Sequence, residues 1–170
     1  MPASEDSITI RVADTIGGLI QFWGFKRGMG RLWTILYLSE EPMSAVELQE
    51  RLAMSAGAVS MHVGELVKWG VVKKTWVPGE RKDFYEPETS VWKMVSRVFR
   101  ERELAQIRGA IEVFEGALAE LGKSDKKRVK LLAERIDSLL QLARVGEALL
   151  SAVLDGRKID LGPIREFSGA

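Results

Sequence analysis

Apolar and polar residues alternate along most of this chain with the period of an α-helix. Between Ser7 and Trp23 the apolar positions recur every three or four residues, and the same spacing returns in two long segments after residue 90. From residue 42 to residue 87 the helical runs are short and are interrupted by prolines and glycines. The pattern therefore predicts a mainly α-helical chain with a small β element in its middle.

The segment from Ser44 to Met54 has the signals of a short helix. Ser44 precedes Glu47 by three positions, which is the spacing of a capping box, in which each residue bonds the backbone N–H of the other. Val46 or Leu48, together with Leu52, supplies one apolar face. We expect a helix of about two turns that ends at Met54.

A second short helix follows after a tight turn. Ser55 is a good N-cap, and Val59, Val63 and Leu66 recur at the spacing of a buried helical stripe. Gly70 can adopt the left-handed conformation that ends a helix. The two helices and the turn between them are typical of a helix-turn-helix.

A charged hairpin comes next. We expect strands over 71–77 and 83–86, joined by a turn at 78–82, with Trp76 and Tyr85 packed across the hairpin. A helix at 31–39, with core residues Leu32, Ile35 and Leu38, completes the unit. Residues 29–88 are therefore predicted to form a winged helix-turn-helix with a two-stranded wing, a module that most often reads DNA.

The outer face of the second helix, opposite Val59, is short and polar. It carries Gly57, Ser60, Met61, Gly64 and Lys68. Serine can bond a base edge or a phosphate, methionine can contact a thymine methyl group, and lysine suits a phosphate. Arg, Asn and Gln are missing from this face, so direct base reading is expected to be modest. A winged helix used only for protein contacts is the alternative, and a small polar face favours DNA.

Basic residues elsewhere supply further candidates. Arg81 at the wing tip is the strongest, because a narrow minor groove attracts arginine, and Lys82 is next. For Lys73 and Lys74 a solvated hairpin is as good an explanation. The glycine-rich stretch 24–31 is either a flexible turn, which we prefer, or a phosphate-binding segment that uses its Lys and Arg residues. The full set of candidate DNA contacts is Ser44, Ser55, Gly57, Ala58, Ser60, Met61, Gly64, Lys68, Lys73, Arg81 and Lys82.

Between Trp23 and Trp92 the chain resembles the GbsR branch of the MarR-like transcriptional regulators. The resemblance rests on the stretches 36–39, 41–44, 54–61, 65–72, 76–86 and 92–93. It implies a homodimeric repressor, with double-stranded DNA as its partner. The absence of cysteine fits a cytoplasmic protein. Some members of that branch respond to choline or related osmolytes, and this ligand does not transfer without its residues.

Residues 89–170 are predicted to form helical dimerisation elements. Their apolar residues repeat at intervals of three and four, as in an antiparallel helix pair or bundle. Two helices with one apolar face each need further partners. We expect the N-terminal helix and linker, residues 1–28, to be one partner and a second copy of the chain to be the other.

Composition limits the chemistry. The chain has one histidine, His62, which we expect to be partly packed, and no cysteine, so a metal site, a cofactor and an enzymatic role are not expected. No apolar run is long enough to span a bilayer. The sequence is compatible with a pocket for a small-molecule effector. The candidate residues for this pocket are Trp23, Trp33, Trp92 and Phe99.

The net charge of residues 1–89 supports an alternative function, that of a protein-binding adaptor. Residues 1–89 hold 10 Lys and Arg against 12 Asp and Glu, so the unit expected to bind DNA is not basic overall. A winged-helix adaptor that binds a protein in transcription or chromosome maintenance is therefore the alternative.

Overall fold

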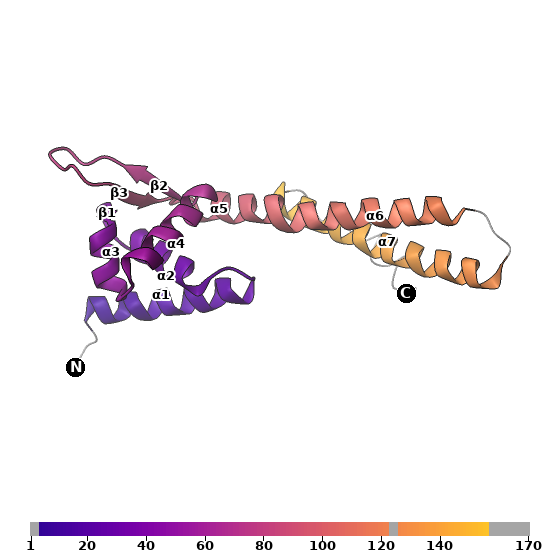
Figure 1. Ribbon diagram of the computed structural model, residues 1–170, viewed down its shortest axis with the longest axis horizontal. Coiled ribbons are helices and arrows are strands. Elements are labelled where there is room, and N and C mark those ends of the chain that lie inside the picture. Colours follow the sequence, from indigo (N-terminus) through magenta and orange to yellow (C-terminus); the bar gives the residue numbers. More distant parts are fainter. Residues whose placement is uncertain (1–3, 123–125, 157–170) are drawn as a thin grey trace. The chain divides into compact units, whose positions relative to one another are not determined.

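The structure is a computed structural model that describes residues 4–122 and 126–156 (Figure 1). The chain forms two compact units, Met1–Met94 and Val95–Ala170. The elements are α1 (Glu5–Phe22), α2 (Arg27–Tyr37), β1 (Met43–Ser44), α3 (Ala45–Leu52), α4 (Ala56–Lys68), β2 (Val72–Thr75), β3 (Phe84–Pro87), α5 (Val91–Val98), the π-helical segment η1 (Phe99–Leu104), α6 (Ala105–Leu121) and α7 (Lys127–Leu154). The prediction of a mainly helical chain with a small wing is confirmed.

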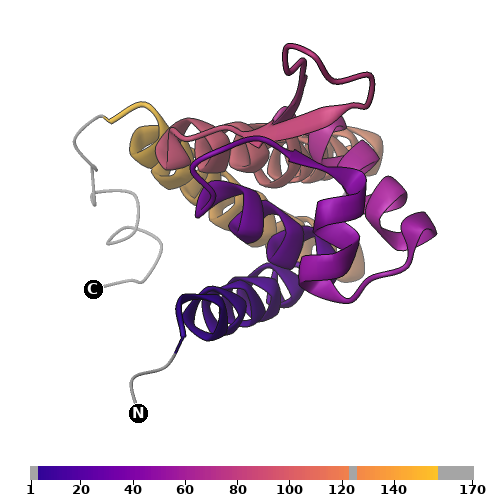
Figure 2. The same ribbon diagram turned by 90° about the vertical axis from the view of Figure 1, so that its left-hand side faces the viewer.

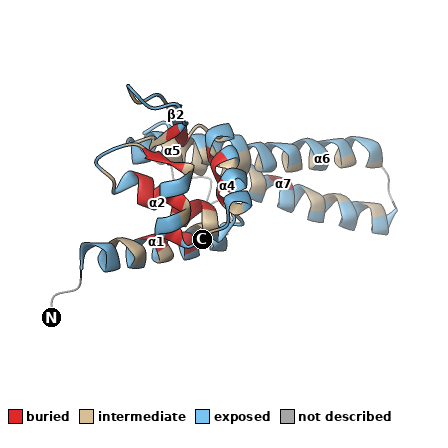
Figure 3. Cartoon of the chain, turned by 60° about the vertical axis from the view of Figure 1, so that its left-hand side comes forward, coloured by how far each residue is buried: buried red, intermediate tan, exposed pale blue. Residues whose placement is uncertain are grey.

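The core of the first unit lies around α2. Leu32, Ile35 and Leu36 are at most 1% exposed, and buried residues concentrate on α2 and α4 (Figure 3). Leu38 was expected in this core, but it follows the last helical residue and is exposed. The apolar stripe of α2 therefore ends at Leu36, two residues earlier than the sequence suggested.

Two glycines allow α1 and α2 to pack closely. A Cβ added at Gly30 would lie 2.9 Å from the Cα of Gly17 and 2.8 Å from Cγ1 of Ile20. A side chain at either glycine would thus separate the helices. The glycine-rich stretch is for this reason part of α2 from Arg27 onward, and the expected flexible turn is limited to the residues before it.

The N-terminal helix belongs to the first unit. Ser4 caps it, and its buried face, which includes Ala13 and Gly17, packs against α2. The sequence led us to expect packing on the dimerisation helices. If α1 also packs on the dimerisation helices, it does so through its opposite, exposed face.

The wing is part of a three-stranded antiparallel sheet with the order β1-β3-β2. The expected two-stranded hairpin is present as β2 and β3, and β1 adds a short third strand in which Met43 pairs with Tyr85. Sequence patterns missed β1 because two residues carry no periodicity. The loop between β2 and β3 extends away from the helices of the first unit (Figure 2).

In the second unit α6 and α7 pack side by side. Two ion pairs join them: Arg108 Nε lies 2.7 Å from Glu147, and a guanidinium nitrogen of Arg144 lies 2.7 Å from Glu115. Because the later residue of α6 pairs with the earlier residue of α7, the helices are antiparallel. Among the described residues, no helix is both long and apolar enough to cross a membrane.

Candidate nucleic-acid interface

Helices α3 and α4 form the helix-turn-helix through local bonds that the sequence predicted. Ser44 and Glu47 make the full capping box at the start of α3. Ala53 ends that helix in the left-handed conformation, one residue before the expected end, with φ +50°. The Ser55 hydroxyl then accepts a 3.2 Å hydrogen bond from the backbone N–H of Ala58, which starts α4.

The two faces of α4 are divided as predicted. Val59, Val63 and Leu66 are buried, with at most 5% exposed. The opposite face is exposed and consists of Gly57, Ser60, Met61, Gly64 and Lys68. Nothing lies within 4 Å of the position that a Cβ would take at Gly57 or Gly64. The backbone of α4 is therefore open to close approach by a ligand along this face.

His62 is fully packed against α2, more deeply than expected. Its ring is 8% exposed and stands where Gly28 leaves room, because a Cβ at Gly28 would lie 2.6 Å from its Cδ2 atom. Burial lowers the pKa of His62, the nearby Lys26 lowers it further, and Glu65 opposes the shift. The imidazole therefore packs between α2 and α4 on the inner face of α4.

The basic residues before and within α2 are used in ion pairs inside the first unit. Lys26 Nζ lies 2.6 Å from Glu65 on α4 and 3.5 Å from the sulfur of Met61. Arg27 and Arg31 both pair with Asp14 of α1, at 3.4 and 2.8 Å. These contacts give the three cations a structural role and connect α1, α2 and α4.

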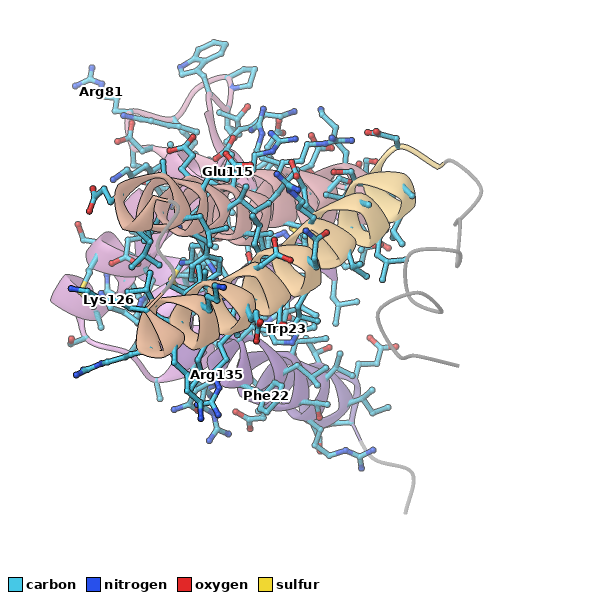
Figure 4. All side chains as sticks on the ribbon, turned by 90° about the vertical axis from the view of Figure 1, so that its right-hand side faces the viewer. Phe22, Trp23, Arg81, Glu115, Lys126 and Arg135 are labelled. Carbon is cyan, nitrogen blue, oxygen red and sulfur yellow. The ribbon has the colours of Figure 1, made fainter. Side chains whose placement is uncertain are left out.

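On the wing, two of the four cations are paired with acids on the other side of the hairpin. Lys74 lies 2.7 Å from Asp83, and Lys73 lies 3.8 Å from Glu86. The Nζ atom of Lys82 stands 5.1 Å from the centroid of the Phe84 ring. Arg81 has no ion pair or hydrogen bond with the described residues, and its side chain projects from the loop (Figure 4).

The exposure of two residues, Ser44 and Trp76, differs from what their predicted roles require. Ser44 was a candidate DNA contact, but it is 1% exposed and its hydroxyl is engaged with Glu47, so it shapes the start of α3 instead. Trp76 was expected to pack across the hairpin with Tyr85. It is 71% exposed, because it follows the last residue of β2, where the hairpin has left the helical core.

The four candidate effector residues have different environments. Trp33 is buried and stacks on Tyr37, with ring centroids 4.7 Å apart, so it serves the core of the first unit. Trp23 and Trp92 are about half exposed, and Phe99 is partly buried in the second unit. Exposed ring surface is therefore found at Trp23 and Trp92, whereas the Trp33 ring is packed in the core, and the effector role of all four residues stays a prediction.

Comparison with known proteins identifies the relatives of this chain. No family model matches it. Over 112 residues it is 30% identical to the HTH-type transcriptional repressor GbsR of Bacillus subtilis (strain 168), a match that covers 66% of this chain and 62% of that protein. It is also 30% identical over 96 residues to the HTH-type transcriptional repressor OpcR of the same organism, covering 56% of this chain and 50% of that protein. The chain thus spans 50 to 62% of the length of these two relatives.

Two further similarities extend over more of the chain. The HTH-type transcriptional regulator MmpR5 of Mycobacterium tuberculosis is 27% identical over 134 residues, which is 78% of each protein. A crystal structure described as a transcriptional regulator superimposes with a TM-score of 0.59 at 20% identity, and covers 88% of this chain and 97% of that one. This likeness supports the fold. All these proteins belong to a non-enzymatic class, in agreement with the prediction that the chain is not an enzyme. The relatives of this chain are HTH-type transcriptional regulators, GbsR among them, which confirms the resemblance found in the sequence.

Proposed function

We propose that the chain is a DNA-binding transcriptional regulator that acts as a homodimeric repressor and responds to a small-molecule effector. The observation that carries this proposal is the exposed face of α4, which is short and polar on a helix whose other face is firmly packed. A helix of this kind fits a major groove, because small side chains let its backbone approach the base edges. Two relatives are named repressors, which supports the same function.

Each exposed side chain of α4 has a chemical use in such a groove. The Ser60 hydroxyl can donate to a base or a phosphate, and Met61 can contact a thymine methyl group. Lys68 at the end of the helix suits a phosphate. Ser55, Gly57 and Ala58 bring the start of the helix, and the positive end of its dipole, toward the DNA backbone. Phosphate contacts position such a protein, and base contacts give it specificity.

The wing supplies the second part of the interface. Arg81 is exposed and free of acidic partners among the described residues, so its guanidinium can enter a minor groove without breaking an ion pair. Lys82 adds a second cation over the Phe84 ring. Lys73 keeps a long contact to Glu86 and contributes less. We therefore assign the strongest electrostatic contact to Arg81.

Homodimerisation is argued from apolar residues that the second unit leaves exposed. On α7 these are Leu131, Leu132, Leu139, Leu142 and Val153, each between 43 and 50% exposed. They lie beside the stripe that packs on α6, so they form a second apolar surface on the same helix. A second copy of the chain would cover this surface and relate two α4 helices by two-fold symmetry. A near-palindromic operator with half-sites about one helical turn apart follows.

The proposed response to a small-molecule effector rests on two exposed aromatic rings. Aromatic faces attract cations, and Trp23 and Trp92 both keep exposed ring surface. An effector that binds the dimer would release DNA by changing the distance between the two α4 helices. Screening cationic osmolytes for release of bound DNA tests this step, and a Trp92→Ala variant should lose the response while it keeps DNA affinity.

The function is tested by DNA titration. Labelled DNA from directly upstream of the protein's own gene is compared with a scrambled sequence at two salt concentrations. Arg81→Ala should weaken binding to both sequences and reduce the slope of log affinity against log salt by about one. Arg11→Ala is the matched control, because Arg11 is also exposed and unpaired among the described residues but lies on α1.

The outcomes separate the two function classes. Tight binding to the upstream DNA alone, weakened by Arg81→Ala and not by Arg11→Ala, supports the regulator. Equal losses for both variants would show that only net charge matters. Absence of salt-dependent DNA affinity would instead favour a winged-helix adaptor, in which Met61 and Gly64 face a protein.

A further inference from the structure

Trp76 is an exposed aromatic residue on the wing for which neither the core nor the hairpin supplies a partner surface. Its side chain is 71% exposed, while Phe84 on the opposite strand is 7% exposed. A large amphipathic ring of this kind is typical of binding surfaces, because it offers apolar area together with an N–H donor and has few torsions to fix. The surroundings of Trp76 indicate what it binds.

The turn next to Trp76 has a regular, hydrogen-bonded geometry. Residues 77–80 form a β-turn in which the backbone N–H of Glu80 donates to the carbonyl of Val77 at 3.1 Å. Pro78 fixes the first central position and Gly79 has φ +87° at the second, which is the pattern of a type II turn. Trp76 directly precedes this turn and Arg81 directly follows it. The exposed indole and the free guanidinium are therefore held at the same end of the hairpin.

The charges around Trp76 favour an anionic partner. Asp83, which faces the end of β2, is neutralised by Lys74 at 2.7 Å. Lys82 is held over the Phe84 ring, and Arg81 is unpaired among the described residues. Glu80 is the remaining acid of the loop and stands against these two cations. An apolar ring beside an excess of positive charge suits a ligand with both phosphates and apolar faces, as in the sugar–phosphate edge of a DNA groove.

We infer that Trp76 is a DNA contact of the wing, with its ring against the deoxyribose edge of the minor groove that Arg81 enters. The inference rests on the proposed DNA-binding function. Proteins that enter the minor groove commonly combine an arginine with an apolar side chain. The ring buries apolar area and carries no charge, so its contribution is independent of base sequence and of salt. The contribution of Arg81, in contrast, depends on the salt concentration. The two contacts can therefore be separated by measuring DNA affinity at two salt concentrations.

The experiment measures DNA affinity for the full-length chain and for Trp76→Ala, Trp76→Phe and Arg81→Ala at two salt concentrations. Trp76→Ala should weaken binding to the upstream and the scrambled DNA about tenfold, or roughly 1.4 kcal/mol, with an unchanged salt slope. Trp76→Phe, which keeps a ring, should lose less than about threefold. Addition of DNA should change the tryptophan fluorescence of the wild type, and this change should be reduced in Trp76→Phe.

Each other result overturns the inference. If the wild type binds DNA and Trp76→Ala binds equally well, Trp76 is not a contact, and the proposed function stands. If Trp76→Ala loses DNA together with its dimer, as measured by sedimentation, the ring belongs to a protein interface instead. If the wild type binds no DNA at low salt, both the inference and the proposed function fail. Because Trp76 is exposed, thermal unfolding of the variants should match the wild type.

Discussion

Replacement of Gly30 by alanine tests the close packing on which the first unit depends. Gly30 lies on α2 against Gly17 and Ile20 of α1. An alanine is the best helix former, so in an open helix position this change stabilises the protein by about 1 kcal/mol. At Gly30 we expect the opposite sign, because the new methyl group has no room.

The magnitude follows from the distances. The added Cβ would lie 2.8 Å from Cγ1 and 2.9 Å from Cδ1 of Ile20, which can shift, but also 2.9 Å from the Cα of Gly17, which is backbone and cannot shift alone. Overpacking of this kind costs about 1 to 3 kcal/mol. After the gain in helix propensity is subtracted, the expected loss in the free energy of unfolding is about 1 kcal/mol.

Gly18→Ala is the matched control, because Gly18 is in the middle of α1 and nothing lies within 4 Å of its Cβ position. It should raise the free energy of unfolding by about 0.5 to 1 kcal/mol. Urea unfolding followed by fluorescence measures both variants, with the buried Trp33 of α2 as a reporter. If Gly30→Ala proves as stable as Gly18→Ala, α1 does not pack on α2 through these glycines, and the reasoning is refuted.

Two further predictions concern the helix-turn-helix. Ser44→Ala removes the buried cap of α3 and should lower the free energy of unfolding by about 0.5 to 2 kcal/mol in urea titrations, whereas Ser55→Ala, at an exposed cap, should cost less. Because the pKa of His62 is lowered on folding, its contribution to stability is complete above its unfolded pKa of about 6.5 and falls as pH drops toward the folded pKa. Stability measured between about pH 8 and pH 5 should show this decline, and His62→Gln should flatten it.

Local signals in the sequence were sufficient for most of the fold. The capping box at Ser44, the cap at Ser55 and the glycine at Gly70 each act through bonds or torsions within a few residues, so they were readable without tertiary structure. The start of α2 was not readable, because glycine disfavours helix on its own. The reason for glycine at these two positions is tertiary, because His62 and Gly17 lie where a Cβ at Gly28 and at Gly30 would be.

The candidate interface was predictable to the extent that it depends on helix periodicity. One face of α4 was correctly separated from the other, and the exposed position of Arg81 followed from its place in a turn. The position of Trp76 did not follow, since a Trp near a Tyr on paired strands usually packs. Whether such a ring is covered depends on where the helical core ends along the hairpin, and sequence periodicity does not carry that information.

The slight excess of acidic residues in 1–89 was an argument against DNA binding, and the distribution of the ion pairs answers that argument. Its paired cations are Lys26 with Glu65, Arg27 and Arg31 with Asp14, Arg51 with Asp6, Lys73 with Glu86, and Lys74 with Asp83. Within the described residues, the cations of 1–89 that form no ion pair are Arg11, Lys68, Arg81 and Lys82, although Lys68 and Lys82 are near enough to Glu65 and Glu47 to lower the pKa of those carboxyl groups.

Three of these four unpaired cations lie on α4 or on the wing. Cations that are already paired contribute little to phosphate binding, because the acid beside each one opposes a second anion. The electrostatic field that DNA would meet is therefore set by the unpaired residues and not by the sum over the unit. The mean composition of 1–89 underestimates the positive charge at the proposed interface, and removal of Arg81 should have a larger effect on the salt dependence than removal of the paired Lys74.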